Sequence, residues 1–170
     1  MSPGFWTDLL NQTVKKLQAR LNKKRPLRVA LMGIGHELRG DDAVGLTVAQ
    51  QLRPYSNRHF LVVEAGHAPE NHTGVLRHFC PDLVLLVDSA QLDEKPGTIR
   101  WLAWQETTGL SASTHTMPPY MLARYLTAEL NCEVALIGIQ PAETTLDFPL
   151  SPAVEKAAHK IIEFSRSLAI

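Results

Sequence analysis

The residues of this sequence that could perform chemistry gather where apolar runs end. Asp42 lies in the turn "GIGHELRGDDAVG", which follows one apolar run, and Asp88 ends a later one. His115 lies in a polar segment just before a helical pattern. Two carboxylates and one imidazole with open coordination positions would suit nickel, zinc, manganese or iron. Open positions indicate exchange or chemistry rather than a purely structural metal site.

Simpler roles for the same residues stay open at this point. Asp41 or Asp42 could cap the helix that follows the turn, and a loop histidine such as His115 could hydrogen-bond locally. A serine hydrolase would need Ser111 or Ser113 to act with His115 and an aspartate. The sequence has no G-x-S-x-G motif to hold such a nucleophile, which disfavours this class.

The glycine-rich turn does not match a nucleotide-binding motif. Gly33 and Gly35 are followed by Gly40, two positions later than the dinucleotide fingerprint requires. No Gly-Lys-Ser/Thr follows the turn, and Asp41 and Asp42 would repel a phosphate at the start of the helix. A cation is therefore the better partner for this turn.

The elements that must position these residues alternate along the chain. Continuous apolar composition predicts strands that are buried on both faces at 27–34, 59–65, 82–89 and 132–139. The alternating segment 97–104 follows the turn signal "DEKPG" and could pair as an antiparallel strand. Helical patterns lie at 41–52, 118–130 and 151–168, with prolines near the start of the last two.

Strands that alternate with helices predict an α/β fold with a mostly parallel sheet covered on both faces. In such a sheet, ligands bind beyond the carboxyl ends of the strands. The segments "GIGHELRGDD", "EAGHAPEN", "DSAQ" and "GIQPAE" follow the four apolar runs. We therefore expect Asp42 and Asp88 to meet at this edge, close to the loop that carries His115.

Composition limits the remaining possibilities. The chain of 170 residues fits one core, and its 17 basic and 17 acidic side chains disfavour nucleic acid or an anionic membrane as a partner. Without a secretion signal or a spanning apolar run, we expect a cytoplasmic protein with no membrane insertion, in which Cys80 and Cys132 are free thiols. Residues 1–26 are expected to form an N-terminal helical extension with an amphipathic pattern, and residues 27–170 the main domain.

Five stretches, taken in order, carry a resemblance to a known family: "GIGHELRGDDAVG", "GHAPEN", "LLVDSAQLDEKPGTIRW", "STHTMP" and "LIGIQP". They resemble the hydrogenase maturation proteases over roughly residues 28–167. The resemblance implies an endopeptidase that removes a C-terminal extension from the [NiFe] hydrogenase large-subunit precursor. Nickel already held by precursor cysteines would be the recognition element, so no tightly held cofactor is expected.

The resemblance also implies a fold and a site. The fold is a three-layer α/β/α sandwich with a twisted five-stranded sheet in which one strand is antiparallel. The family's metal-binding positions fall on Asp42, Asp88 and His115, which the resemblance also implies for catalysis. Glu64, at a position where relatives usually carry aspartate, is our candidate for a nearby acid or base.

One residue of the first glycine-rich turn departs from the family pattern. His36 stands where relatives usually have asparagine, and we expect it to hydrogen-bond the turn rather than to bind the metal. A non-enzymatic alternative also uses the same three ligands: a nickel chaperone, or a metal-dependent binding module, that cleaves nothing.

Overall fold

Five strands form a single sheet in the computed structural model, which describes residues 5–22, 24–107 and 117–170. Their order across the sheet is β2-β1-β3-β5-β4. The pairings among the first four are parallel, and β4 runs antiparallel to β5, which confirms the predicted mostly parallel sheet. The strands are β1 (Val29–Ile34), β2 (Phe60–Gly66), β3 (Leu83–Ser89), β4 (Ile99–Ala103) and β5 (Glu133–Ile139).

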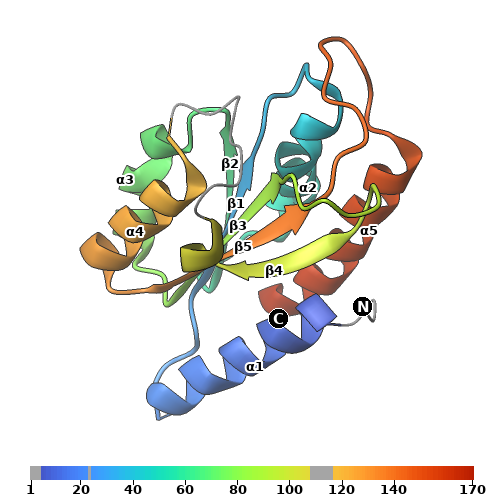
Figure 1. Cartoon of the computed structure of the whole chain (residues 1–170). Helices are drawn as coiled ribbons and strands as arrows, with labels where there is room; N and C mark the ends of the chain where they lie inside the picture. Colours follow the sequence, from blue (N-terminus) through green and yellow to red (C-terminus); the bar gives the residue numbers. More distant parts are fainter. Residues whose placement is uncertain (1–4, 23, 108–116) are drawn as a thin grey trace.

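Helices cover both faces of this sheet, so the predicted three-layer α/β/α architecture is also confirmed (Figure 1). One face carries α2 and α5 together with α1, and the other carries α3 and α4. None of the described helices is long and apolar enough to cross a membrane. The helices are α1 (Phe5–Arg20), α2 (Val44–Leu52), α3 (Thr73–Phe79), α4 (Pro119–Leu130) and α5 (Pro152–Arg166).

The central strands explain the continuous apolar runs in the sequence. Leu31 of β1 and Leu85 of β3 pack into the core beneath α2 and α5, whereas the alternate residues Met32 and Leu86 pack beneath α4. Every residue of β1 is buried, as a strand with helices on both faces requires. The outer strands β2 and β4 are only partly buried because they form the edges of the sheet.

Proline marks the start of two helices, as the sequence predicts. Pro119 opens α4 and Pro152 opens α5, with Ser151 at the preceding capping position. A further helix, α3, was not predicted; it has seven residues, of which only Leu76 is buried. One buried side chain does not produce a helical period, so apolar spacing could not reveal this helix.

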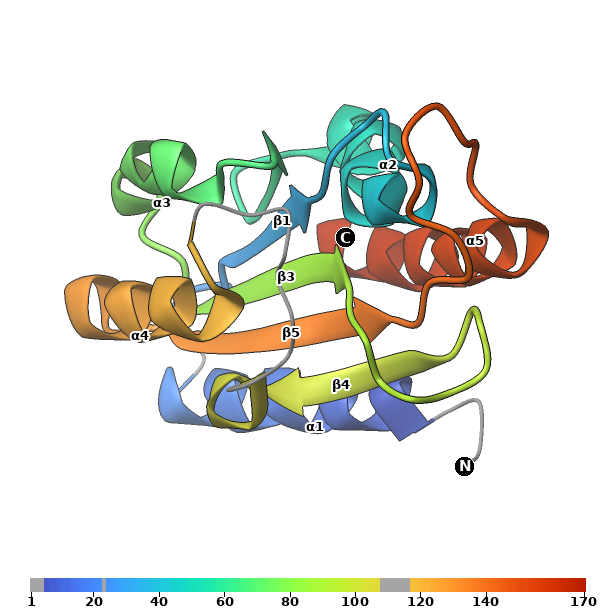
Figure 2. The same ribbon diagram turned by 45° about the horizontal axis from the view of Figure 1, so that its top comes forward.

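The N-terminal helix α1 packs into the main core. Its apolar face buries Trp6, Leu10 and Leu17, and α1 lies alongside β4 (Figure 2). The Trp6 ring meets the Phe164 ring of α5 edge-on, with centroids 5.2 Å apart. The amphipathic pattern in this segment is therefore explained by a helix that covers the sheet.

Asp82, just before β3, forms hydrogen bonds that hold the segment between α1 and β1 in place. Its carboxylate accepts hydrogen bonds from both terminal nitrogens of Arg25, at 2.8 and 2.7 Å, and from the Arg28 main-chain N–H at 2.8 Å. Burial alone would raise the pKa of Asp82. The hydrogen bonds and the positive charges of Arg25 and Arg28 outweigh burial, so the pKa lies below its ordinary value.

We predict that Asp82→Asn lowers the free energy of unfolding by about 1–2 kcal/mol at neutral pH, because a bidentate charged contact is lost at a partly exposed position. Since the folded-state pKa of Asp82 is lowered, its stabilisation is complete above the unfolded pKa of about 4 and disappears as pH falls through the folded value. Urea unfolding of both proteins from pH 7 to pH 2 measures this difference. A difference that stays constant across that range would contradict the role of the ionised carboxylate.

The two cysteines occupy different environments, and both are free thiols, as predicted. Cys80 is exposed, and Cys132 is buried at the start of β5. Burial is the main cause that raises the pKa of the Cys132 thiol to about 11. Neither cysteine is at the carboxyl edge of the sheet, so neither belongs to the candidate site.

Candidate active site at the carboxyl edge of the sheet

The turn after β1 packs unusually closely against the sheet, and its glycines make this possible. A Cβ atom added to Gly35 would lie 1.8 Å from the carbonyl oxygen of Asp42, and one added to Gly45 would lie 2.0 Å from that of Val87. No side chain fits at either distance. Gly35 also has a φ of +144°, which favours glycine. The glycines of this turn thus bring Asp42 against the ends of β1 and β3.

Asp42 lies in the 3₁₀ turn Gly40–Ala43 with only 5% of its surface exposed. One carboxylate oxygen accepts a hydrogen bond from the His36 main-chain N–H at 3.0 Å. The other accepts one from the Ser89 hydroxyl at 3.1 Å. Hydrogen bonds of this kind orient a carboxylate, as the outer partners of a metal ligand do.

Asp88 is the residue before Ser89 and lies at the end of β3, 1% exposed and opposite Gly138 of β5. Because Ser89 hydrogen-bonds Asp42, the chain holds two buried carboxylates at the same edge of the sheet. Both residues thus lie at the edge where they were expected, and the meeting of their carboxylates around one ion stays a prediction.

His115, the expected third ligand, lies outside the described residues, as do Ser111 and Ser113. Within the described part of the chain, no three histidine, cysteine, aspartate or glutamate side chains are grouped so that they could hold a metal ion. The three-ligand site therefore stays a prediction from the sequence and from the resemblance.

Neither aspartate caps a helix, so the capping expectation for Asp41 and Asp42 was wrong. The residue before the 3₁₀ turn is Arg39 and the one before α2 is Ala43, and neither helix start has a side-chain cap. The two carboxylates instead make contacts with distant parts of the chain. Tertiary hydrogen bonds thus replace the local capping bonds that sequence alone would favour.

The carboxylate of Asp41 is fully buried and accepts hydrogen bonds from the loop between β5 and α5. It accepts hydrogen bonds from the main-chain N–H groups of Ala142, Glu143 and Ser151, at 2.8, 3.0 and 2.6 Å. The Ser151 hydroxyl donates a further bond at 2.9 Å. The Asp41 N–H in turn donates to the Glu143 carbonyl at 2.7 Å. This cluster, which we call the Asp41 clasp, joins the first turn of the site to the last.

In Asp41→Asn an NH2 group replaces one carboxylate oxygen. This group is a donor, so it cannot accept the hydrogen bonds of the N–H groups that point at it. We predict that Asp41→Asn lowers the free energy of unfolding by about 2–4 kcal/mol, because N–H groups lose a charged acceptor. Chemical denaturation measures the change. Asp147→Asn is the matched control, because Asp147 is exposed on the same loop with a φ of 65°, which asparagine tolerates. Equal stability losses in the two variants would contradict the clasp.

His36 hydrogen-bonds the turn, as predicted, because its Nδ1 accepts a bond from the Leu38 N–H at 3.2 Å. The structure adds a partner that the sequence analysis missed. The ring of His67, in the loop after β2, lies with its centroid 5.3 Å from that of His36 and its plane tilted by 32°. Its position in "EAGHAPEN", after the second strand, was the available signal, because that loop also lies at the carboxyl edge.

Glu64 is half-buried in β2 and forms an ion pair with Arg53, with 3.1 Å between Oε1 and Nη1. Arg53 follows the last residue of α2. This contact gives Glu64 a structural role at the edge of the sheet. A role for Glu64 as an acid or base stays a prediction.

Three large apolar side chains are exposed close to the Asp41 clasp. Leu38, Leu146 and Phe148 are each at least half exposed, and they come from the turn after β1 and the loop before α5. These two segments are joined by a 2.7 Å hydrogen bond from the Asp147 N–H to the Leu38 carbonyl. We call this set the apolar rim. It offers a hydrophobic surface beside the buried carboxylates.

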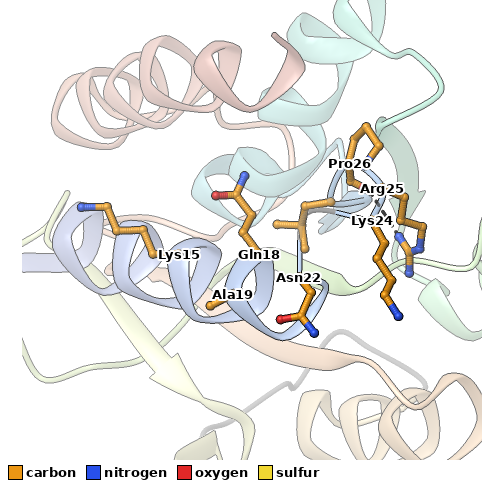
Figure 3. Close-up of a pocket in the computed structure, with 8 residues that line it drawn as sticks. Lys15, Gln18, Ala19, Asn22, Lys24, Arg25 and Pro26 are labelled. Carbon is orange, nitrogen blue, oxygen red and sulfur yellow. Dashed lines mark hydrogen bonds between the residues drawn. The ribbon is translucent and has the colours of Figure 1, made fainter.

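A groove of about 900 Å³ lies at the other end of the sheet, between α1 and the segment that leads into β1. Figure 3 shows Gln18 and Ala19 of α1, and Asn22 just after this helix, beside the segment that carries Arg25 and Pro26. Because Leu27 precedes β1 and Asp42 follows it, the groove does not coincide with the carboxyl edge. It does not belong to the candidate active site.

Comparison with known proteins defines the class to which this fold and site belong. The family model of the hydrogenase maturation proteases, HycI, matches residues 43–166. The chain therefore belongs to the hydrogenase maturation protease family and is a peptidase. This membership confirms the resemblance found in the sequence.

Individual relatives agree with this assignment. A putative hydrogenase maturation protease of Methanocaldococcus jannaschii is 33% identical over 144 residues, which cover 79% of this chain and 84% of the relative. The hydrogenase 3 maturation protease of Escherichia coli K12 is 27% identical over 134 residues, covering 78% and 85%. The crystal structure of the [NiFe] hydrogenase maturation protease HycI from Thermococcus kodakarensis superposes with a TM-score of 0.78 at 30% identity, covering 86% of this chain and 94% of that one.

Proposed function

We propose that this peptidase removes the C-terminal extension of a [NiFe] hydrogenase large-subunit precursor in the cytoplasm, and that it recognises nickel already bound to the precursor. Family membership and the names of the relatives support the reaction and the kind of substrate. The observation that carries the proposal is that two buried carboxylates, Asp42 and Asp88, lie at the carboxyl edge, and that Ser89, the residue after Asp88, hydrogen-bonds Asp42.

Asp42, Asp88 and His115 are proposed to contact the nickel that arrives with the precursor. Carboxylate oxygens and an imidazole nitrogen are suitable donors for this ion, and three protein ligands leave positions for ligands of the substrate. A precursor without nickel would lack this anchor, so cleavage would depend on metal loading. An ion at this point can polarise a carbonyl group or a water molecule.

The remaining residues of the site are proposed to hold the substrate in place. The hydrogen bonds from His36 and Ser89 fix the Asp42 carboxylate, so the scissile peptide is presented in one orientation. Fixed orientation of reacting groups can lower the barrier by several kcal/mol. Glu64 is proposed as a nearby acid or base, with Arg53 holding its carboxylate.

Processing assays with purified precursor test this proposal directly. We predict that Asp42→Asn, Asp88→Asn and His115→Ala each reduce cleavage of the nickel-loaded precursor by at least about 100-fold, because the substrate loses its fixed position. His159→Ala is the control, since His159 is exposed on α5, away from the carboxyl edge. Gel electrophoresis measures the precursor that remains, and circular dichroism shows that each variant is folded.

Nickel-free precursor provides the second arm of the same assay. We expect the unaltered enzyme to leave it uncleaved, because the anchor is missing. Mass spectrometry of the released peptide separates a peptidase from the alternative, a nickel chaperone or metal-dependent binding module. Equal cleavage of loaded and unloaded precursor would refute nickel recognition, and binding without any released peptide would favour the alternative.

The apolar rim supports a protein substrate for this site. Leu38 and Phe148 are exposed on two segments that the Asp41 clasp holds together. Asp41 is the neighbour of Asp42 in the chain, so these apolar side chains are held close to the site. A rigid apolar surface gains free energy when an apolar segment of a partner covers it. We propose that the apolar rim binds the precursor next to the bond that is cleaved.

We predict that Phe148→Ser raises the KM for the nickel-loaded precursor by about tenfold and leaves kcat nearly unchanged. A tenfold change corresponds to about 1.4 kcal/mol of binding free energy. This is less than the free energy gained when a phenylalanine side chain is fully buried. Steady-state kinetics of processing measures both constants. Val75→Ser is the matched control, because Val75 is an exposed apolar residue on α3, outside the apolar rim. Similar KM values for the two variants would exclude the apolar rim from precursor binding.

A further inference from the structure

His36 and His67 form a pair of imidazoles that the proposed function does not use. The two rings come from different loops at the carboxyl edge, one after β1 and one after β2. His67 is exposed and His36 is half-buried, so a dissolved ion can reach both. Imidazole nitrogen is a common ligand for nickel, copper and zinc.

The distance between the rings fits two ligands of a single ion. With metal–nitrogen bonds of about 2.1 Å and ring centres about 1.2 Å further along each bond, tetrahedral coordination places two imidazole centroids about 5 Å apart. The centroids of His36 and His67 are 5.3 Å apart. The measured separation is therefore close to that of two imidazole rings bound to one ion.

We propose that His36 and His67 together bind one divalent ion of the nickel, copper and zinc class, at a site separate from Asp42 and Asp88. Two protein ligands leave at least two coordination positions for water or for donors of an incoming molecule. Such a site exchanges its ion readily. It also lies next to the proposed active site, because the His36 N–H bonds the Asp42 carboxylate.

Metal binding has a local consequence that can be observed. In the structure the Leu38 N–H donates to His36 Nδ1. If the ion binds Nδ1, that lone pair is used, and if the ion binds Nε2, the ring proton moves to Nδ1. In both cases the Leu38 N–H loses this acceptor. Leu38 is exposed, so water can take the place of the imidazole.

Titration of the full-length protein with zinc chloride and with nickel chloride tests the proposal. We expect the Leu38 amide resonance and the ring resonances of His36 and His67 to shift together as Zn²⁺ is added, in nuclear magnetic resonance spectra. Calorimetry with Ni²⁺ should show that His67→Ala weakens binding at this site roughly tenfold or more, because a second ligand in the same protein acts at high effective concentration. His159→Ala, which removes another exposed imidazole, should bind as the unaltered protein does.

Asp88→Asn separates this site from the proposed active site. We expect the variant to keep the Leu38 response to Zn²⁺ while it loses processing of the precursor. A Leu38 amide that does not respond to the ion, or His67→Ala binding as tightly as the unaltered protein, would overturn the two-histidine site. Loss of the Leu38 response in Asp88→Asn would overturn it as a separate site. Normal processing by Asp88→Asn would refute the proposed function alone.

Discussion

One buried carboxylate, that of Asp41, connects the parts of the carboxyl edge that lie furthest apart in sequence. It joins the turn after β1 to the loop between β5 and α5 and to Ser151, the residue just before that helix. Main-chain N–H groups that converge on an ionised acceptor hold it in one geometry, since such bonds are roughly twice as strong as neutral ones. The position of Asp42, the next residue, depends on this anchor, and so does the relative placement of Leu38 and Phe148.

Two neighbouring carboxylates thus have different surroundings and different roles. Asp41 is held by donors of a distant loop, and Asp42 is oriented by His36 and Ser89. Adjacent residues in a 3₁₀ turn point in different directions, so one can be structural while the other faces a ligand. The close approach of Gly35 to Asp42 is what allows the turn to lie so near the strand ends.

The sequence was most informative where a pattern is repeated, and least informative where a contact joins distant segments. Apolar runs predicted the buried strands because β1, β3 and β5 lie between two helical layers, and proline predicted the starts of α4 and α5. The rule that ligands bind beyond the carboxyl ends of parallel strands predicted that Asp42 and Asp88 lie at one edge of the sheet. Capping preference failed for Asp41, because its partners are about a hundred positions away and local propensity contains no information about them. His67 follows a strand, so its place at the same edge as His36 was open to prediction, but the contact between the two rings depends on side-chain positions that local pattern does not contain.

The packing of α1 affects how a large molecule can approach the enzyme. With α1, α2 and α5 on one face of the sheet and α3 and α4 on the other, both broad sides of the molecule are covered by helices. Asp42 and Asp88 lie at the carboxyl ends of the strands, so a partner protein that reached them would come in end-on, parallel to the strands. A flexible, extended tail can enter along that direction more easily than a folded domain, which favours cleavage near a chain terminus.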